Sequence, residues 1–194
     1  TDADGKVVYL YTTDPTAQYN YIKAANDRGY NVLVLDGQLD NHFVGYLENK
    51  LEGVTLVRVD ADVTDNLIRR GDRKAADLDA ADRTILTRLF ELAARKVDKA
   101  SFTVQFEALD ADADPVVLTQ NEYMRRMKEM AAMQPGMNIY GELPDSYNLV
   151  VNTANPLVDS VRTATHDALA ATVEPLLADI DKGNADAEAA RKAM

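Results

Sequence analysis

Lys6-Val7-Val8-Tyr9-Leu10-Tyr11 is a run of β-branched and aromatic side chains, which predicts a buried β-strand. Two further apolar runs of this kind follow, over residues 31–35 and 55–59. The intervals between the three runs carry helical patterns. Strand–helix–strand–helix–strand with apolar strands predicts a small parallel αβα sheet, covered by helices and joined by right-handed crossovers.

The first of these helices has clear end signals. Asp14 is a candidate N-cap, Pro15 suits the first helical position, and Gly29 suits the C-terminal stop. The second helix is expected from about residue 39 to residue 51. Its apolar side is expected to carry Phe43, Val44, Leu47 and Leu51.

The remainder of the chain predicts an α+β architecture, a helix-rich domain with a short three-stranded sheet. Residues 69–82, with four basic side chains before an Ala- and Asp-rich run, are expected to form a linker into a helix at about 80–97. The buried side of that helix is expected to carry Ile85, Leu86, Leu89, Phe90, Leu92 and Ala93. Strands are expected at 101–108, 116–119 and 148–152, and a final helical tract at 159–181 with a break near Pro175. The predicted domains are 1–70 and 71–194.

Composition excludes several classes of protein. An apolar fraction of 46% is ordinary for a folded domain, and no run is long enough to cross a membrane. The absence of cysteine rules out disulfides and thiolate chemistry. A net charge of −11 disfavours nucleic acid as a partner. Thr1 at the start, and a helical pattern without a stop signal at 186–194, predict a piece of a longer polypeptide.

Five of the six methionines fall in one short stretch. The stretch opens with Thr119-Gln120-Asn121-Glu122, a capping-box pattern with Thr119 as N-cap, and closes at Gln134-Pro135-Gly136. A helix of about four turns is therefore expected, within the usual globular range. At about 100° per residue, one half of that helix carries most of the apolar side chains, interrupted by Arg126, with Arg125 on the other half.

Two interpretations of this methionine helix stay open from the residues alone. Unbranched, polarizable thioethers can repack against many shapes, which suits a face that grips varied apolar partners. Methionine also fills gaps in ordinary protein cores.

Few residues carry a pattern that points to catalysis or to a metal. Asp110, Asp112 and Asp114 lack the glycine and the glutamate of a calcium loop, so an acidic hairpin turn is expected there. The two histidines, His42 and His166, have no zinc-type partner four residues away. Neither a nucleophile elbow nor a glycine-rich phosphate loop is present. These observations predict a binding or assembly module without catalytic or metal-binding residues.

Several segments together resemble the ninety-kilodalton heat-shock chaperone family in its bacterial form. Residues 8–12 and 29–35 resemble the tyrosine-rich strand and the G-x-x-V-L-x-L strand of that family, and Asp40 matches part of its D-P-I-D-E stretch. Residues 115–119 with the methionine helix resemble a strand and an amphipathic helix of its C-terminal domain. Residues 148–158 are similar to its L-x-x-N-x-x-H-P-L segment, with Asn155 in place of the histidine.

The resemblance implies the last α/β subdomain of a middle domain, followed by most of a C-terminal domain without its final dimerisation helices. The full-length protein would be a cytoplasmic, homodimeric stress-response chaperone that binds ATP and magnesium through an upstream domain. Its partners would be unfolded or partly folded client proteins. The client-binding residues implied here are Tyr123, Met124, Met127, Met130, Met133 and Met137.

Two other functions remain open. The chain can be a structural module whose methionine helix packs on another domain or subunit. It can also be a small α/β nucleotide-binding enzyme, because open sheets bind ligands beyond the carboxyl ends of their strands. That crevice would be lined by Thr12, Thr13, Asp14, Asp36 and Asp60.

Overall fold

A computed structural model describes residues 1, 5–37, 39–68, 76–95, 97, 100–120, 123–126, 128 and 145–193. The chain forms two compact units, each considered by itself below. The first unit comprises Thr1–Arg73, Lys99–Ser101 and Val117–Leu149, and the second comprises Lys74–Asp98, Phe102–Val116 and Val150–Met194. The division into domains 1–70 and 71–194 stays a prediction, and the contacts within the first unit include a segment from far along the chain.

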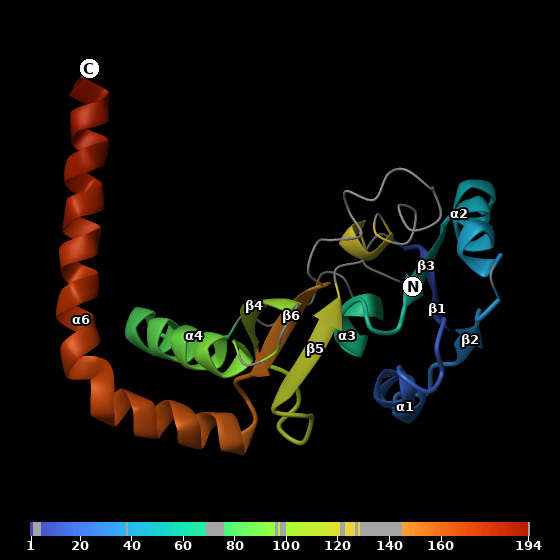
Figure 1. Cartoon of the computed structure of the whole chain (residues 1–194), viewed down its shortest axis with the longest axis horizontal. Coiled ribbons are helices and arrows are strands. Elements are labelled where there is room, and N and C mark those ends of the chain that lie inside the picture. Colours follow the sequence, from blue (N-terminus) through green and yellow to red (C-terminus); the bar gives the residue numbers. More distant parts are fainter. Residues whose placement is uncertain are drawn as a thin grey trace. The chain divides into compact units, whose positions relative to one another are not determined.

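A three-stranded parallel sheet forms the centre of the first unit, as predicted (Figure 1). Its strands are β1 (Val7–Thr12), β2 (Val32–Val34) and β3 (Val54–Arg58), in the order β2-β1-β3. Leu10 of β1 pairs with Val32 on one side and with Val57 on the other. The β-branched side chains of these strands favour this extended, half-buried geometry.

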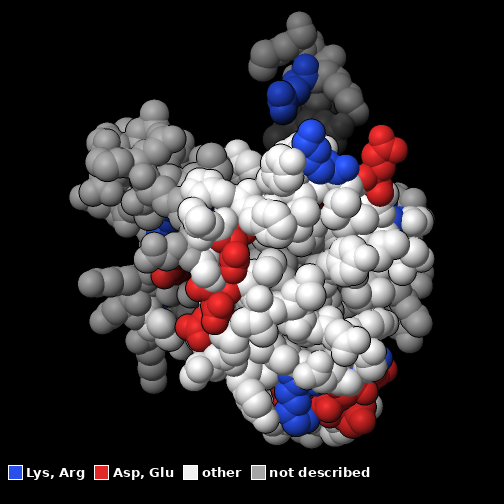
Figure 2. Space-filling model, turned by 90° about the vertical axis from the view of Figure 1, so that its right-hand side faces the viewer, with Lys and Arg blue, Asp and Glu red and all other residues white. Residues whose placement is uncertain are grey.

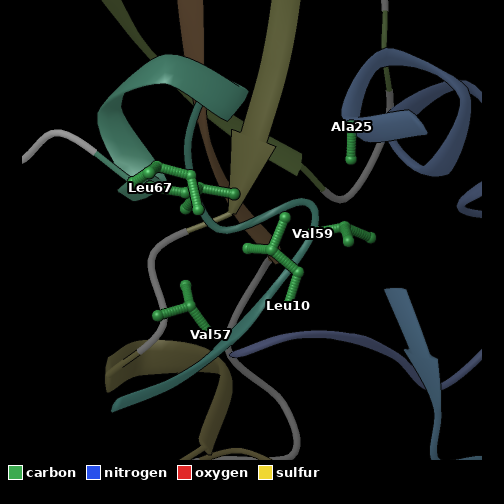
Figure 3. Packing of buried hydrophobic residues seen from close by; sticks show 6 residues of the cluster. Leu10, Ala25, Val57, Val59 and Leu67 are labelled. Atoms are coloured by element: carbon green, nitrogen blue, oxygen red, sulfur yellow. The ribbon is translucent and has the colours of Figure 1, made fainter. Parts of the chain in front are cut away.

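Helices cover both faces of this sheet. Leu10 packs in one core cluster with Ala25 of α1 (Tyr19–Asp27) and Leu67 of α3 (Thr64–Ile68), as Figure 3 shows. The next residue, Tyr11, points to the opposite face because side chains alternate along a strand. Tyr11 therefore packs with Val44 of α2 (Asp40–Lys50) in a second cluster. The predicted αβα arrangement is confirmed.

The α2 helix lies near its predicted position, but α1 begins at Tyr19, so the prediction that Asp14 caps the helix and Pro15 opens it is wrong. The carboxylate of Asp14 accepts hydrogen bonds from the backbone N–H groups of Thr16 and Ala17, at 3.0 and 2.9 Å, and caps the turn before α1. Gly29 ends α1 in the left-handed region, with φ 80°, as expected. The predicted apolar side of α2 is partly wrong, because Phe43 and Leu51 are exposed while Val44 is buried.

The α3 helix was not predicted, because a helix of five residues is too short to show a helical period in the sequence.

In the second unit, α4 (Ala80–Ala94) begins at the predicted residue, and the carboxylate of Asp79 accepts from the backbone N–H of Asp82 at 2.7 Å. It ends three residues before the predicted end.

The buried side of α4 is narrower than predicted. It packs against α6 (Pro156–Ala193) and buries Ile85 and Leu86. Leu89, Leu92 and Ala93 were predicted on the buried side, and all three are exposed. The physical reason is that one neighbouring helix covers a narrower stripe than the full apolar arc of the sequence pattern.

The α6 helix begins earlier and runs further than predicted. The carboxamide oxygen of Asn155 accepts from the backbone N–H of Leu157 at 2.9 Å, so Asn155 caps the helix and Pro156 opens it. The helix continues through Pro175 rather than breaking there. Figure 1 shows that α6 changes direction partway along, and proline commonly causes such bends because it removes one N–H donor.

The second sheet differs from the expected connectivity. Its strands are β4 (Ala100–Glu107), β5 (Val116–Gln120) and β6 (Asp145–Asn152), in the order β4-β6-β5. The acidic turn after β4 is therefore not a hairpin, because β6 separates the two strands that the turn connects. Val150 and Val151 of β6 are fully buried, which suits a central strand. Helix α6 and the other helices in the described part of the chain all lack the combination of length and apolarity needed to span a bilayer.

Truncating Leu86 to alanine should lower the free energy of unfolding by about 2–5 kcal/mol, because its side chain is fully buried between α4 and its neighbours. Truncating Leu89, one turn away and exposed, should cost about 1 kcal/mol or less. Urea unfolding followed by far-ultraviolet circular dichroism measures both. Equal losses for the two variants would contradict the burial of α4 described above.

Candidate functional site

The start of the methionine segment is helical at residues 123–126 and exposes two of the predicted client-binding side chains. Tyr123 is 69% exposed and Met124 is 43% exposed. Met127, Met130, Met133 and Met137 lie outside the described residues. The predicted N-cap at Thr119 is wrong, because Thr119 and Gln120 belong to β5 and the backbone N–H of Gln120 bonds to the carbonyl of Asp60.

The next residue of this turn, Arg125, is buried in the first unit. Its Nη2 donates a hydrogen bond of 3.0 Å to the hydroxyl of Tyr11 on β1. The sequence pattern placed Arg125 opposite the apolar half of the helix, which would normally mean the solvent side. The structure reverses that interpretation, since the guanidinium faces inward and the turn is anchored through it.

Arg126 forms a second anchor, to α2. Its guanidinium makes a bidentate ion pair with Glu48, with nitrogen–oxygen distances of 2.7 and 3.1 Å, and also lies 3.4 Å from the carbonyl of Leu56 on β3. Two parallel charge-assisted bonds fix orientation as well as distance. In the apolar pattern Arg126 looked like an interruption of the methionine face, but its side chain ties the turn at residues 123–126 to α2.

The strand that precedes the turn is held by a polar network at the end of β3. Nη2 of Arg58 donates to a carboxylate oxygen of Asp60 at 2.7 Å. The same nitrogen also donates to the carboxamide oxygen of Gln120 at 2.8 Å. The hydroxyl of Tyr21 on α1 donates to the carbonyl of Leu118 on β5. Leu118, Gln120, Arg125 and Arg126 are therefore tied to β1, β3, α1 and α2 of the same unit.

Burial favours the neutral form of two tyrosines near Asp60, Tyr21 and Tyr147. Burial raises the pKa of Tyr21, and the nearby Asp60 carboxylate raises it further. Burial also raises the pKa of Tyr147, with Asp145 adding to the effect. A protonated Tyr21 hydroxyl is what the hydrogen bond to the Leu118 carbonyl requires.

A separate apolar group is exposed on α2 and next to it. Leu39, Phe43 and Tyr46 all present large apolar surface to solvent, and the Lys50 ammonium lies 5.8 Å from the centre of the Tyr46 ring. On the face shown in Figure 2, charged side chains form small groups separated by broad uncharged surface. Sequence reasoning missed this group because helical periodicity alone assigns such side chains to a core.

The crevice at the carboxyl ends of the first three strands offers little to a phosphate. Thr12 is fully buried, and its hydroxyl is hydrogen-bonded to the side-chain oxygen of Gln18. The same oxygen accepts from the backbone N–H groups of Thr13 and Asp14, at 3.1 and 3.4 Å. Backbone donors that a phosphate would need are thus already bonded to Gln18.

In the second unit, Asp79, Asp82 and His166 present ligand atoms within 4.8 Å of one another. One carboxylate oxygen of Asp82 already contacts Arg162 at 3.0 Å, and the other contacts His166 at 2.8 Å. Both carboxylate oxygens of Asp82 therefore already have protein partners, and we assign no metal ion to this group.

The aspartate loop is held by asparagine side chains rather than arranged around an ion. The carboxamide of Asn152 donates to the carbonyl of Asp110 at 2.8 Å and accepts from the backbone N–H of Leu109 at 3.0 Å. Asn155 donates to the carbonyl of Ala113 at 2.9 Å. Loop carbonyls that could bind calcium are bonded to protein donors.

Comparison with curated proteins relates this chain to chaperones named HtpG. It is 49% identical over 180 residues to the Chaperone protein HtpG of Porphyromonas gingivalis, which covers 93% of this chain and 26% of that protein. It is 44% identical over 181 residues to the HtpG chaperone of Bacteroides fragilis, an alignment that covers 93% of this chain and 27% of that protein. It is 45% identical over 176 residues to the HtpG chaperone of Bacteroides thetaiotaomicron, with 91% of this chain and 26% of that protein covered. No family model matches the chain.

The chain thus spans about a quarter of the length of the curated relatives it matches, in their C-terminal part. All of these relatives carry the HtpG name, so the resemblance to the bacterial ninety-kilodalton heat-shock chaperones is confirmed.

A double-mutant cycle should detect the Arg126–Glu48 anchor. Replacing both residues by glutamine, singly and together, should give a coupling energy of about 1 kcal/mol in urea unfolding, because the pair is bidentate and partly buried. The matched control is Lys23–Asp27, an exposed pair on α1, whose coupling should be about 0.5 kcal/mol or less. A coupling at Arg126–Glu48 no larger than that of the control would show that this pair does not anchor the turn.

Proposed function

We propose that this chain, as the C-terminal part of a chaperone of the HtpG family, supplies client-contact and scaffold surfaces for unfolded or partly folded proteins. In the full-length protein, ATP and magnesium would bind to an upstream domain and drive a clamp formed by two subunits in the cytoplasm. This part of the chain would carry no catalytic residue of its own. Its task would be to bind clients and to support the surface that binds them.

The observation that carries this proposal is the opposite orientation of neighbouring side chains within one helical turn. Tyr123 and Met124 are exposed, while Arg125 and Arg126 bond inward to β1 and α2. An apolar side chain left in water has a favourable free energy of burial with any apolar partner. A turn anchored by two arginines presents such side chains without collapsing onto its own core.

The chemistry of these side chains suits clients of varied shape. A thioether on an unbranched chain adapts to irregular apolar surface, and tyrosine combines an apolar ring with a polar tip. Met127, Met130, Met133 and Met137 would complete the proposed surface. The exposed apolar group on α2, joined to the same turn through Glu48, supports an extended contact area.

A structural or assembly role is the second candidate, because exposed apolar side chains also suit a permanent subunit interface. In that case Tyr123 and Met124 would be covered in a stable oligomer. Sedimentation of the chain over a range of concentrations separates the two, since an assembly module would associate through these residues and a client-binding surface would leave the monomer intact.

Replacing Tyr123 and Met124 by serine should weaken suppression of aggregation of a thermally unfolded test protein, without nucleotide. Adding Met127→Ser, Met130→Ser and Met133→Ser should abolish it. Each lost apolar contact removes at most about 1.5–3 kcal/mol of binding free energy, so the losses should accumulate. Light scattering measures the suppression, and circular dichroism checks that the variants remain folded.

The matched control is Leu176→Ser, which removes a comparably exposed apolar side chain from α6. It should leave suppression unchanged. If the methionine variants unfold the chain, those side chains belong to its core and the proposal fails. If the control and the Tyr123 and Met124 variants lose suppression equally, no particular surface binds clients.

A separate measurement tests the alternative that the chain binds a nucleotide. Calorimetric titration of the chain with ATP and Mg²⁺ should show no binding heat, because Gln18 already bonds the donors at the carboxyl end of β1. Saturable binding that is lost in Thr12→Val would instead support a nucleotide site in this crevice.

A further inference from the structure

A buried carboxylate in the second unit lies between two cationic groups of the neighbouring helix. The side chain of Asp82 on α4 is only 4% exposed. Nη1 of Arg162 on α6 lies 3.0 Å from one of its oxygens, and Nδ1 of His166, one turn further along α6, lies 2.8 Å from the other. Both oxygens of Asp82 therefore bond to the same face of α6.

Among the described residues, the charged groups nearest His166 besides Asp82 lie on α4 and α6. From α4, Asp79 at the N-cap faces the imidazole in addition to Asp82. On α6 itself, Glu174 lies two turns further along, and Arg162 one turn before. Arg162 also pairs with Asp159 at 2.7 Å. The imidazole thus lies among carboxylates, with one guanidinium nearby that is itself paired twice.

We propose that Asp82, Arg162 and His166 form a pH-sensitive clasp, which holds α4 against the first part of α6 most tightly when the imidazole of His166 is protonated. The geometry supplies what such a device needs. One buried charge lies between the two helices, one partner keeps its charge at all physiological pH values, and one partner is a histidine with access to solvent.

The electrostatic shifts agree with this geometry. The hydrogen bond with Asp82 raises the pKa of His166 above its ordinary value, partial burial opposes this, and the Asp82 and Asp79 charges add to the rise. Burial alone would raise the pKa of Asp82, but the bonds from His166 and Arg162 bring it below its ordinary value. The pair therefore favours the state in which the imidazole is charged and the carboxylate is ionised.

The direction of the pH effect follows from these shifts. A histidine whose pKa is raised by folding contributes stability that is complete below its unfolded-state pKa and is lost as pH rises through its folded-state pKa. The Asp82 contribution is present above the carboxyl's unfolded-state pKa and is lost as pH falls through its lowered value. The clasp is therefore tightest between acidic and near-neutral pH, and it weakens on the alkaline side.

Deprotonation loosens the clasp without opening it. Arg162 keeps its charge and its bond to Asp82. A neutral imidazole that retains the proton on Nδ1 still donates to the other oxygen, but without the charge that strengthens the bond. The expected result is a change in how often α4 and α6 separate, with the fold of each helix retained. Figure 1 shows that α6 bends partway along, so the clasp acts on one limb of a bent helix.

Two linked measurements test the proposal on the whole chain. The pKa of His166 is measured by nuclear magnetic resonance titration of its imidazole nitrogens, with His42→Gln used for assignment. Amide hydrogen exchange of α4 and α6 is measured from pH 5.5 to 8.5 and corrected for intrinsic rates. Protection should fall as pH rises, and a pKa raised by one unit corresponds to a fall of up to about tenfold.

Two variants decide the outcome. His166→Gln, at a partly exposed position, should remove the pH dependence of protection, whereas His42→Gln should retain it. Asp82→Asn should lower the pKa of His166 even if α4 and α6 pack less tightly. A flat protection profile in the unaltered chain, a profile that persists in His166→Gln, or a His166 pKa that is unchanged in Asp82→Asn would each overturn the proposal.

Discussion

The guanidinium of Arg125, buried in the first unit and bonded to the hydroxyl of Tyr11, constrains much of the surrounding structure. A buried cation is tolerated only with hydrogen-bond partners, because its transfer from water costs several kcal/mol. Tyr11 lies on the central strand of the parallel sheet and packs against Val44 of α2. The turn at residues 123–126 is therefore fixed to the sheet, with Tyr123 and Met124 directed to solvent. A proposed binding surface in water thus depends on a polar contact in the core.

The second unit follows the same rule with the opposite sign of charge. Asp82 is a buried anion, and α6 supplies both of its cationic partners. In each unit a buried charged side chain bonds to a neighbouring element, Arg125 to β1 and Asp82 to α6. The difference lies in the partners. Arginine carries a permanent positive charge, whereas histidine is the side chain whose charge changes most readily near neutral pH. The first contact is therefore permanent, and the second responds to its surroundings.

Much of the fold could be predicted because it follows local rules. Apolar runs and end signals such as Gly29 give the strands and helices of the first unit. The similarity to HtpG chaperones could also be predicted, from strands whose residue order matches the family. The wrong predictions concern which elements pack or pair with one another. The turn after β4 looked like a hairpin until β6 was found between its strands, and Leu89 looked buried because periodicity gives a face without saying what covers it.

The sequence by itself determined most of the elements, the parallel sheet with its covering helices, the absence of disulfides, and the position of the methionine segment along the chain. Tertiary structure alone decided that Arg125 turns inward, that Arg126 pairs with Glu48 seventy-eight residues away, and that His166 meets Asp82. The physical reason is the distance along the chain over which each kind of interaction acts. Propensity, capping and periodicity act over a few residues, whereas the orientation of a charged side chain depends on which distant group compensates its loss of water.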